Sequence, residues 1–183
     1  LQREGQLERD VDRLVRNDRI AWGASMIACQ DADAMVTGNI RHYAASIEKL
    51  KKVTDPRPGE EIFGMTMITL KGKTILVADT NVQDFPSPER LVKVSKSCVR
   101  VARLFGFDPK VAFLSHSTFG KPISKNTKHV RDAINLLRTE KVDFDFDGEM
   151  QPDVALNPIY QEIYPFSKIV GNANILIMPA LHS

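Results

Sequence analysis

The chain has 183 residues, of which 43% are apolar and 26% are charged, as expected of a globular protein with a hydrophobic core. Its 25 basic and 23 acidic side chains leave a net charge of +2, so charge predicts neither a nucleic-acid partner nor binding to an anionic membrane. No apolar run reaches the roughly 18 residues of a membrane-spanning helix, and no signal peptide is recognisable. A cytoplasmic location is therefore expected.

Cys29 and Cys98 each lie within an apolar helical pattern, which predicts buried free thiols. Their spacing indicates neither a metal site nor a disulfide framework. Trp22 is expected in the core. The chain begins at Leu1 without a methionine and stops soon after an apolar run, which we interpret as a fragment of a larger protein.

Hydrophobic periodicity predicts the elements of the first third of the chain. They are a helical pattern at 6–31 with a break at Asn17-Asp18, a strand at 33–37 and a helix at 42–52. Asn17 or Asp18 would cap the second part of the helical pattern. The Pro- and Gly-containing stretch 55–59 follows, and it is the expected domain boundary.

The rest of the chain alternates between strands and helices. The expected elements are a hairpin at 62–70 and 74–78, a helix that Ser87 and Pro88 begin and Gly106 ends, a strand at 110–115, a helix at 126–140, a strand at 142–146, an interrupted helix at 150–163 and a strand at 174–178. This alternation with one hairpin predicts an α/β fold with a mixed sheet.

One candidate site lies in the stretch from Val111 to Lys121, where a short apolar strand gives way to small polar residues before a helix. Open α/β folds place ligands at such loops, and backbone N–H groups there favour an anion. Ser117, Thr118 and Lys121 are its candidate binding residues. An ordinary strand–helix connection is the alternative.

A second candidate lies after the strand at 142–146, whose alternation turns its apolar residues inward. Asp147 and Glu149 would then project at the carboxyl edge of the sheet, where ligands bind in this fold class. A solvated strand end is the alternative. The residues from Asp143 also match the first half of a calcium loop, but Val154 stands where that loop needs glutamate, so no calcium site is expected.

Arg41 and His42 form a third candidate, because they follow the predicted strand at 33–37. An arginine there could bind phosphate through two parallel hydrogen bonds. A solvated helix start is the alternative. The four histidines show no metal-binding spacing, and neither a dinucleotide-binding nor a hydrolase motif occurs, so no metal is expected in this chain.

Several stretches together resemble the phosphotransacetylase family, and they occur in the order of that family. They are Ala32–Gly38, Val77–Thr80, Val111–Gly120, Asp147–Gln151 and Gly171–Pro179. Further stretches resemble a particular variant, the C-terminal phosphotransacetylase-like domain of large bacterial NADP-dependent malic enzymes. These are Asp147–Met150, Asp153–Asn157, Tyr164–Phe166 and Met178–Ser183.

The resemblance implies a fold of two α/β/α lobes, like that of isocitrate and isopropylmalate dehydrogenases, with a ligand cleft between them. Residues 1–52 would be the end of the first lobe, 55–170 nearly all of the second, and 171–183 the start of the return to the first. It also implies a homodimer formed through the second lobe. NADP and a divalent metal would belong to a separate malic enzyme domain.

The residues depart from the family at its anion site. Arg41-His42-Tyr43 stands where the family has His-Ser-Ser or His-Ser-Thr, and Glu48-Lys49 stands where it has Arg-Pro. A carboxylate at an anion site opposes phosphate binding by charge repulsion. Phe119 replaces the lysine of the family's Ser-Thr-Lys-Gly loop, so a second cation is missing.

These departures imply a domain that keeps the fold without catalytic residues of its own. The resemblance implies that it binds acetyl-CoA as an allosteric ligand and helps the parent malic enzyme to oligomerise. The loop 115–121 would then line an acetyl-CoA or regulatory site. An active phosphate acetyltransferase and a purely structural dimerisation module are the alternatives.

Overall fold

The computed structural model describes residues 5–39, 41–80, 85–121 and 127–179. The chain divides into two compact units, Leu1–Pro58 and Gly59–Ser183. The division falls within the stretch 55–59 that the sequence indicates as a boundary. In the described part of the chain, none of the helices combines the length and the apolar character needed to cross a membrane.

The first unit contains three helices, α1 (Glu8–Asn17), α2 (Arg19–Ala28) and α3 (Tyr43–Val53). The predicted break at Asn17-Asp18 is confirmed, because the Asp18 carboxylate caps α2 by accepting from the backbone N–H groups of Ile20 (2.9 Å) and Ala21 (3.2 Å).

Three predictions for the first unit are wrong. Residues 33–37 form no strand, because no described segment of the unit pairs with them, and Val36 is fully exposed. Trp22 is 54% exposed, and Cys29 is exposed as well. Both lie on faces of the helical segment that its own apolar periodicity assigned to a core.

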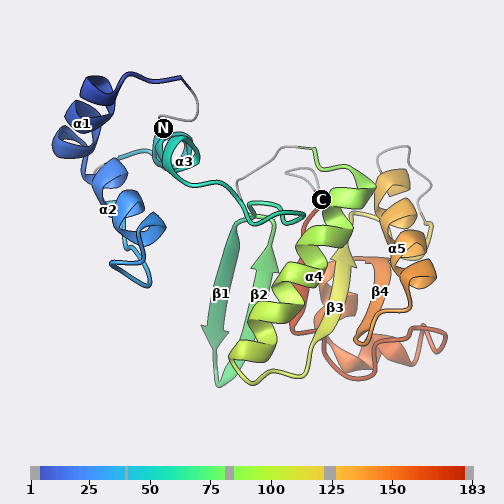
Figure 1. Cartoon of the computed structure of the whole chain (residues 1–183). Helices are drawn as coiled ribbons and strands as arrows, with labels where there is room; N and C mark the ends of the chain where they lie inside the picture. Colours follow the sequence, from blue (N-terminus) through green and yellow to red (C-terminus); the bar gives the residue numbers. More distant parts are fainter. Residues whose placement is uncertain (1–4, 40, 81–84, 122–126, 180–183) are drawn as a thin grey trace. The chain divides into compact units, whose positions relative to one another are not determined.

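The second unit is a five-stranded mixed sheet with helices on both faces (Figure 1). Its elements are β1 (Met65–Leu70), β2 (Lys73–Ala78), α4 (Pro88–Leu104), β3 (Lys110–Leu114), α5 (Lys128–Glu140), β4 (Asp145–Met150), α6 (Pro152–Leu156), the 3₁₀ helix η3 (Pro158–Gln161) and β5 (Ile175–Ile177). The strand order is β1-β2-β5-β3-β4, with β1 antiparallel to β2 and the other neighbours parallel. The predicted fold class is confirmed.

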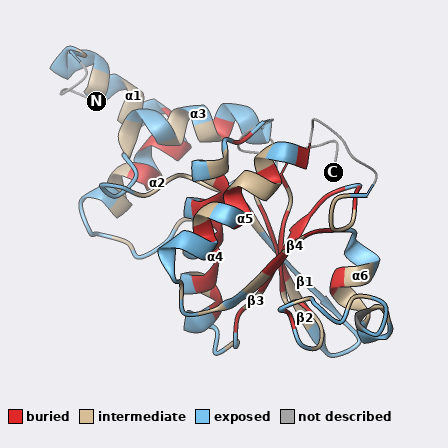
Figure 2. Ribbon diagram, turned by 90° about the vertical axis from the view of Figure 1, so that its right-hand side faces the viewer, coloured by how far each residue is buried: buried red, intermediate tan, exposed pale blue. Residues whose placement is uncertain are grey.

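Two layers of apolar side chains enclose the sheet. On one face, α4 and α5 bury residues such as Leu91, Cys98 and Leu137 against Phe113. On the other face, α6 and the segment 169–173 pack against the opposite sides of the same strands. Figure 2 shows the buried residues between these layers, with α4 and α5 on one side of the strands and α6 on the other.

The helix α4 begins and ends as its sequence predicts. The Ser87 hydroxyl accepts from the N–H of Arg90 (3.3 Å), and Pro88 occupies the first helical position. Gly106 follows the helix with φ of 79°, a left-handed conformation that glycine adopts without steric cost.

Two sequence-based boundaries in the second unit need correction. The strand predicted at 142–146 lies at 145–150, because pairing with β3 rather than the alternation of apolar residues sets its limits. The segment 171–183 was expected to begin the return to the first lobe. Its described part instead supplies β5, which is buried between β2 and β3 in the middle of the second unit's sheet.

The two cysteines should differ sharply in reactivity. Burial raises the pKa of the Cys98 thiol to about 12, and its Sγ lies 3.5 Å from the Sδ of Met65. The thiolate is the reactive form, so at mildly alkaline pH a thiol reagent should modify exposed Cys29 in the folded protein and Cys98 only after unfolding. Mass spectrometry of labelled peptides would measure this. Modification of Cys98 in a folded Cys29→Ser variant would contradict it.

Candidate functional site

The connections of β3 and β4 leave the sheet toward opposite faces, since α5 follows β3 on one face and α6 follows β4 on the other. Ligands of open α/β sheets bind outside the carboxyl ends of the strands at such a topological switch point. The loop 115–121, Glu149 and Gln151 occupy this position, and we call them the switch-point site.

The loop 115–121 is held in one conformation by backbone hydrogen bonds. The N–H of Ser115 donates to the carbonyl of Met150 (3.0 Å), and the N–H of Phe119 donates to that of Glu149 (2.8 Å). Thr118 and Lys121 close a tight turn through reciprocal bonds of 2.9 and 3.2 Å. The two central residues of the turn, Phe119 and Gly120, have φ of 48° and 91°, as in a type I′ turn.

The side chain of Glu149 stabilises this loop through hydrogen bonds. Its side chain is fully buried, and its Oε1 accepts from the Ser117 hydroxyl (2.8 Å) and the N–H of Gly120 (3.1 Å). The strand register shifts between Phe113 and Leu114 of β3, which face Gly148 and Met150, so that Glu149 is the extra residue of a bulge. Bulges redirect a side chain, and this one directs a carboxylate into the loop.

The prediction that Asp147 and Glu149 project at the strand end is therefore wrong. Both carboxylates lie within β4 and are buried, at 3% and 1% exposure. Asp147 accepts from the N–H of Lys168 (2.8 Å) and from the guanidinium of Arg138 (3.4 Å). These bonds stabilise the segment around Lys168 against β4.

The structure brings Ser117, Thr118, Lys121 and Glu149 together. Thr118 accepts from the N–H of Gln151 through its hydroxyl (3.2 Å), and the Gln151 amide donates to the carbonyl of His116 (2.9 Å). The Lys121 side chain is exposed. The loop that follows β3 and the residue that follows β4 are thus tied to each other by hydrogen bonds.

Sequence reasoning missed Arg131, which lies one turn into α5. Its Nε is 3.7 Å from Oε2 of Glu149, and its side chain is 38% exposed. That carboxylate oxygen is buried and accepts no hydrogen bond from the described residues. Arg131 therefore adds a cation from α5 to the switch-point site, beside the loop in which Phe119 stands where the family resemblance places a lysine.

The ring of Phe119 packs against two other aromatic rings. Its centroid is 5.3 Å from that of Tyr164 and 4.8 Å from that of Phe166, in tilted and edge-to-face arrangements that aromatic pairs favour. These contacts connect the loop 115–121 to the segment after η3.

Arg41 and His42 lie in the first unit. Arg41 donates to the buried carboxylate of Asp18 (2.8 Å), and Lys49 forms a hydrogen bond with the same oxygen. His42 is exposed and precedes α3 without a side-chain capping bond. An open pocket of about 430 Å³ is lined by Arg41 together with Arg19 and residues 35–39.

Because of Asp18, we expect the stability of the first unit to depend on pH in the acidic range. Burial alone would raise its pKa, but hydrogen bonds from Lys49, Arg41, Ala21 and Ile20 outweigh burial and hold the pKa well below the usual range. Its stabilising contribution is therefore complete above the unfolded pKa of about 3.9 and is lost as the pH falls below that value.

We expect Asp18→Asn to lower the stability of the first unit near neutral pH by about 2 kcal/mol, because hydrogen bonds to a charged group are lost. The variant should also weaken the acid dependence below about pH 4. The fluorescence of Trp22, the one tryptophan of the chain, reports unfolding of this unit. Asp31→Asn, at an exposed position, is the control. Equal acid dependence in both variants would contradict the role of Asp18.

A second buried network lies at the carboxyl end of β2, and no sequence motif indicated it. The guanidinium of Arg90 donates to Glu61 (2.8 Å), to the carbonyl of Ile62 (2.7 Å) and to Asp79 (3.1 Å). Asp79 also accepts from the N–H of Gly64 (2.7 Å). This network fixes the segment that enters the second unit.

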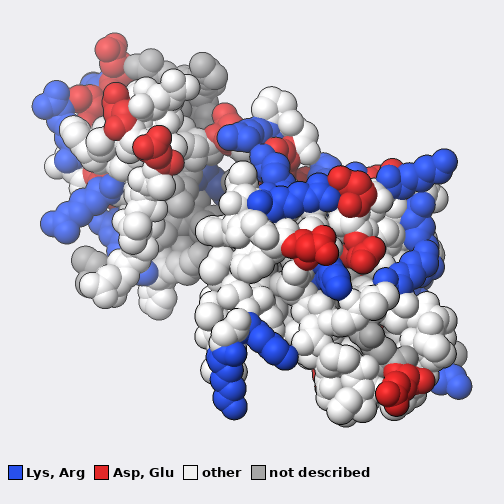
Figure 3. All heavy atoms as spheres, turned by 90° about the horizontal axis from the view of Figure 1, so that it is seen from below, with Lys and Arg blue, Asp and Glu red and all other residues white. Residues whose placement is uncertain are grey.

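The described residues contain no group of three histidine, cysteine, aspartate or glutamate side chains arranged to hold a metal ion. On the surface seen in Figure 3, lysine and arginine side chains are interspersed with aspartate and glutamate, without one extended basic patch.

The family described as phosphate acetyl/butaryl transferase matches residues 1–183. An NADP-dependent malic enzyme from Rhizobium meliloti (strain 1021) is 45% identical over 183 residues, which are 100% of this chain and 24% of that protein. A probable NADP-dependent malic enzyme from Rickettsia prowazekii (strain Madrid E) is 36% identical, with 100% of this chain and 25% of that protein covered. The chain spans about a quarter of the length of these relatives.

A crystal structure of a phosphotransacetylase from Streptococcus pyogenes superposes with a TM-score of 0.87 and 27% identity, and the match covers 99% of this chain and 56% of that one. The resemblance seen in the sequence stretches is thereby confirmed, and so is its variant, because relatives named as malic enzymes match over the whole chain. The chain belongs to the phosphate acetyl/butaryl transferase family.

Proposed function

We propose that this chain is the phosphotransacetylase-like regulatory and oligomerisation domain of an NADP-dependent malic enzyme, and that it senses acetyl-CoA. The observation that carries the proposal is the 45% identity to such an enzyme over the whole chain. The parent protein would oxidatively decarboxylate malate in the cytoplasm. NADP and a divalent metal would bind outside this domain.

The local geometry supports binding in preference to acetyl transfer. The Arg41 guanidinium is paired with Asp18, and the Phe119 ring packs among aromatic rings where the family resemblance places a lysine. The loop 115–121 is nevertheless ordered by Glu149 and Gln151, as a ligand site requires. Oligomerisation is proposed to use the second unit, in a homodimer.

The test uses the full-length protein that contains this chain, with NADPH formation from malate measured at increasing acetyl-CoA. Acetyl-CoA should lower the rate, and allostery of this kind requires different affinities in two enzyme states. A rate independent of acetyl-CoA would refute regulation. Release of free CoA from acetyl-CoA in the presence of phosphate would instead establish the alternative, an active phosphate acetyltransferase.

Oligomerisation is tested separately by light scattering on the full-length protein and on a version that lacks this domain. The proposal expects a smaller assembly without the domain. If acetyl-CoA fails to bind while the assembly still depends on the domain, the purely structural role is correct.

A further inference from the structure

We propose that Arg131 is the cation with which the switch-point site binds a phosphate or pyrophosphate group of its ligand. This inference deepens the proposed function, on which it rests, because acetyl-CoA carries both kinds of group. It identifies a residue that neither the loop motif nor its spacing indicated.

The guanidinium of Arg131 has one edge engaged and one edge available. Its Nε faces Oε2 of Glu149 at 3.7 Å. Among the described residues, no acceptor hydrogen-bonds to its Nη groups. A guanidinium offers N–H groups in a fixed fork that matches two oxygens of a phosphate. The Arg131 side chain is 38% exposed, as the access of a ligand to that fork requires.

Glu149 positions this cation. The carboxylate is itself fixed by the Ser117 hydroxyl and the N–H of Gly120, and β4 holds it through a bulge. A binding group whose partner is fixed loses less conformational entropy when a ligand arrives. Glu149 is therefore a positioning residue, and Arg131 is the residue that would touch the ligand.

The guanidinium lies close to the loop backbone at Gly120. A Cβ added at Gly120 would be in ordinary contact with Nη1 of Arg131, at 3.8 Å, and the φ of 91° favours glycine there for the turn itself. A phosphate on Arg131 would therefore also be near the backbone of the type I′ turn.

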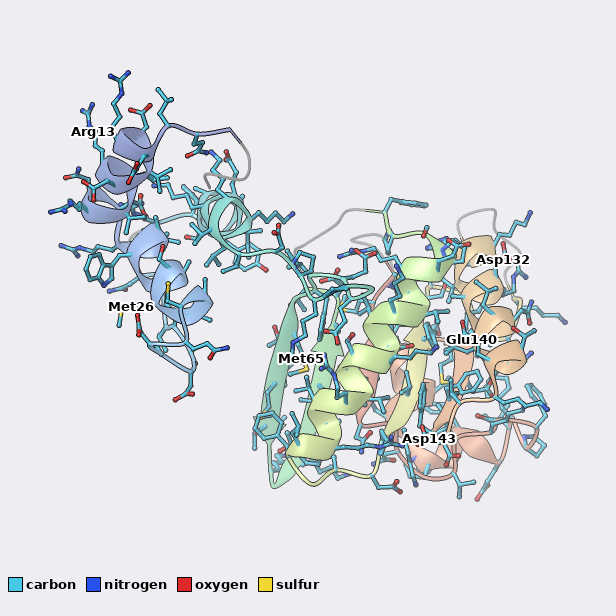
Figure 4. All side chains as sticks on the ribbon, viewed as in Figure 1. Arg13, Met26, Met65, Asp132, Glu140 and Asp143 are labelled. Atoms are coloured by element: carbon cyan, nitrogen blue, oxygen red, sulfur yellow. The ribbon has the colours of Figure 1, made fainter. Side chains whose placement is uncertain are left out.

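The surrounding charges favour an anion on balance. Lys121 and Lys128 are exposed, and Lys128 is three residues before Arg131, on the same face of α5. The N-terminal end of α5 adds a partial positive charge. Glu149 offsets Arg131 on its buried side. Asp132 also lies on α5, where Figure 4 labels it. As the next residue after Arg131 it projects about 100° farther around the helix, so it lies on a different face.

The chain contains a matched control for this residue. Arg138 is seven residues later on α5, and it also faces a buried β4 carboxylate, with 3.4 Å between its Nη2 and Oδ1 of Asp147. It is two turns farther from the loop 115–121. Arg131→Met and Arg138→Met therefore remove similar ion pairs, but only the first removes a cation from the switch-point site.

The experiment titrates the isotopically labelled 183-residue chain with pyrophosphate and follows the Gly120 amide and the Arg131 Nε–H signal by NMR. We expect saturable shifts of both signals in the unmodified chain. Arg131→Met should weaken binding by about tenfold or more, Arg131→Lys should weaken it less, and Arg138→Met should leave it unchanged.

Binding that is absent, or that is equal in Arg131→Met and the unmodified chain, would overturn the inference. An equal loss in Arg138→Met would also overturn it, since the effect would then be structural. The two proposals can fail separately. If pyrophosphate binding depends on Arg131 but acetyl-CoA leaves malate decarboxylation unchanged, the Arg131 site stands and acetyl-CoA regulation falls. If acetyl-CoA inhibits the full-length Arg131→Met enzyme as it does the unmodified one, acetyl-CoA regulation stands and the role of Arg131 in binding the ligand falls.

Discussion

Replacing Arg90 by methionine is expected to lower the free energy of unfolding of the second unit by about 3–5 kcal/mol. The Arg90 side chain is 12% exposed and its partner Asp79 is 3% exposed. Without the guanidinium, the Asp79 carboxylate stays buried, and among the residues that the structure describes the N–H of Gly64 is its remaining donor. Urea unfolding followed by circular dichroism measures the change.

Lys93→Met is the matched control, because Lys93 pairs with the same Glu61 but is 47% exposed. Exposed ion pairs contribute less than about 1 kcal/mol, so this variant should be nearly neutral. Adding Asp79→Asn to Arg90→Met should recover part of the loss, because the unpaired charge is then gone. Equal stability of Arg90→Met and Lys93→Met would show that the buried network contributes little.

The second large effect is expected for Gly148→Ala, at about 4 kcal/mol. Gly148 has φ of 147°, and an added Cβ would lie 2.6 Å from the carbonyl oxygen of Phe113 on the neighbouring strand. The strands β3 and β4 would have to separate at the bulge that directs Glu149 into the loop. The variant should therefore unfold at a lower temperature than the unmodified chain, and it should bind pyrophosphate more weakly.

Gly72→Ala separates backbone strain from steric conflict. Gly72 also has a positive φ, of 77°, but nothing lies within 4 Å of its Cβ position in the hairpin turn. This variant should cost about 1 kcal/mol. If Gly148→Ala costs no more than Gly72→Ala, the contact with Phe113 relaxes easily and the argument from close strand approach is wrong.

Local patterns predicted the helices and the hairpin of the second unit well. The pair Ser87-Pro88 and the later Gly106 mark the ends of α4 because caps and left-handed residues act within a few residues of the chain. Lys71 and Gly72 turn the hairpin for the same reason, with φ of 49° and 77°.

The predictions that failed depend on partners far away in the sequence. Residues 33–37 have the composition of a strand but no neighbouring strand to bond with, and β4 takes its limits from β3. The exposure of Cys29 and Trp22 follows from which faces of the helices other segments cover. Periodicity shows that a face is apolar, but not what covers it.

The candidate site was predicted in part. Ser117, Thr118 and Lys121 do lie in an ordered loop at the carboxyl ends of the strands. Arg41 was expected to face an anion, but it is bonded to Asp18, which is 23 residues earlier in the chain. No local signal relates these two positions.

The sequence by itself determined the fold class, the family and the position of the loop 115–121, because these depend on hydrophobic periodicity, capping residues and ordered motifs along the chain. Only the tertiary structure decided the roles of the charged groups. A bulge turns Glu149 inward beneath the loop, and α5 places Arg131 against that carboxylate from 18 residues away. Whether a carboxylate is a ligand group or a buried brace depends on burial and on partners that approach through space, and local sequence does not encode either.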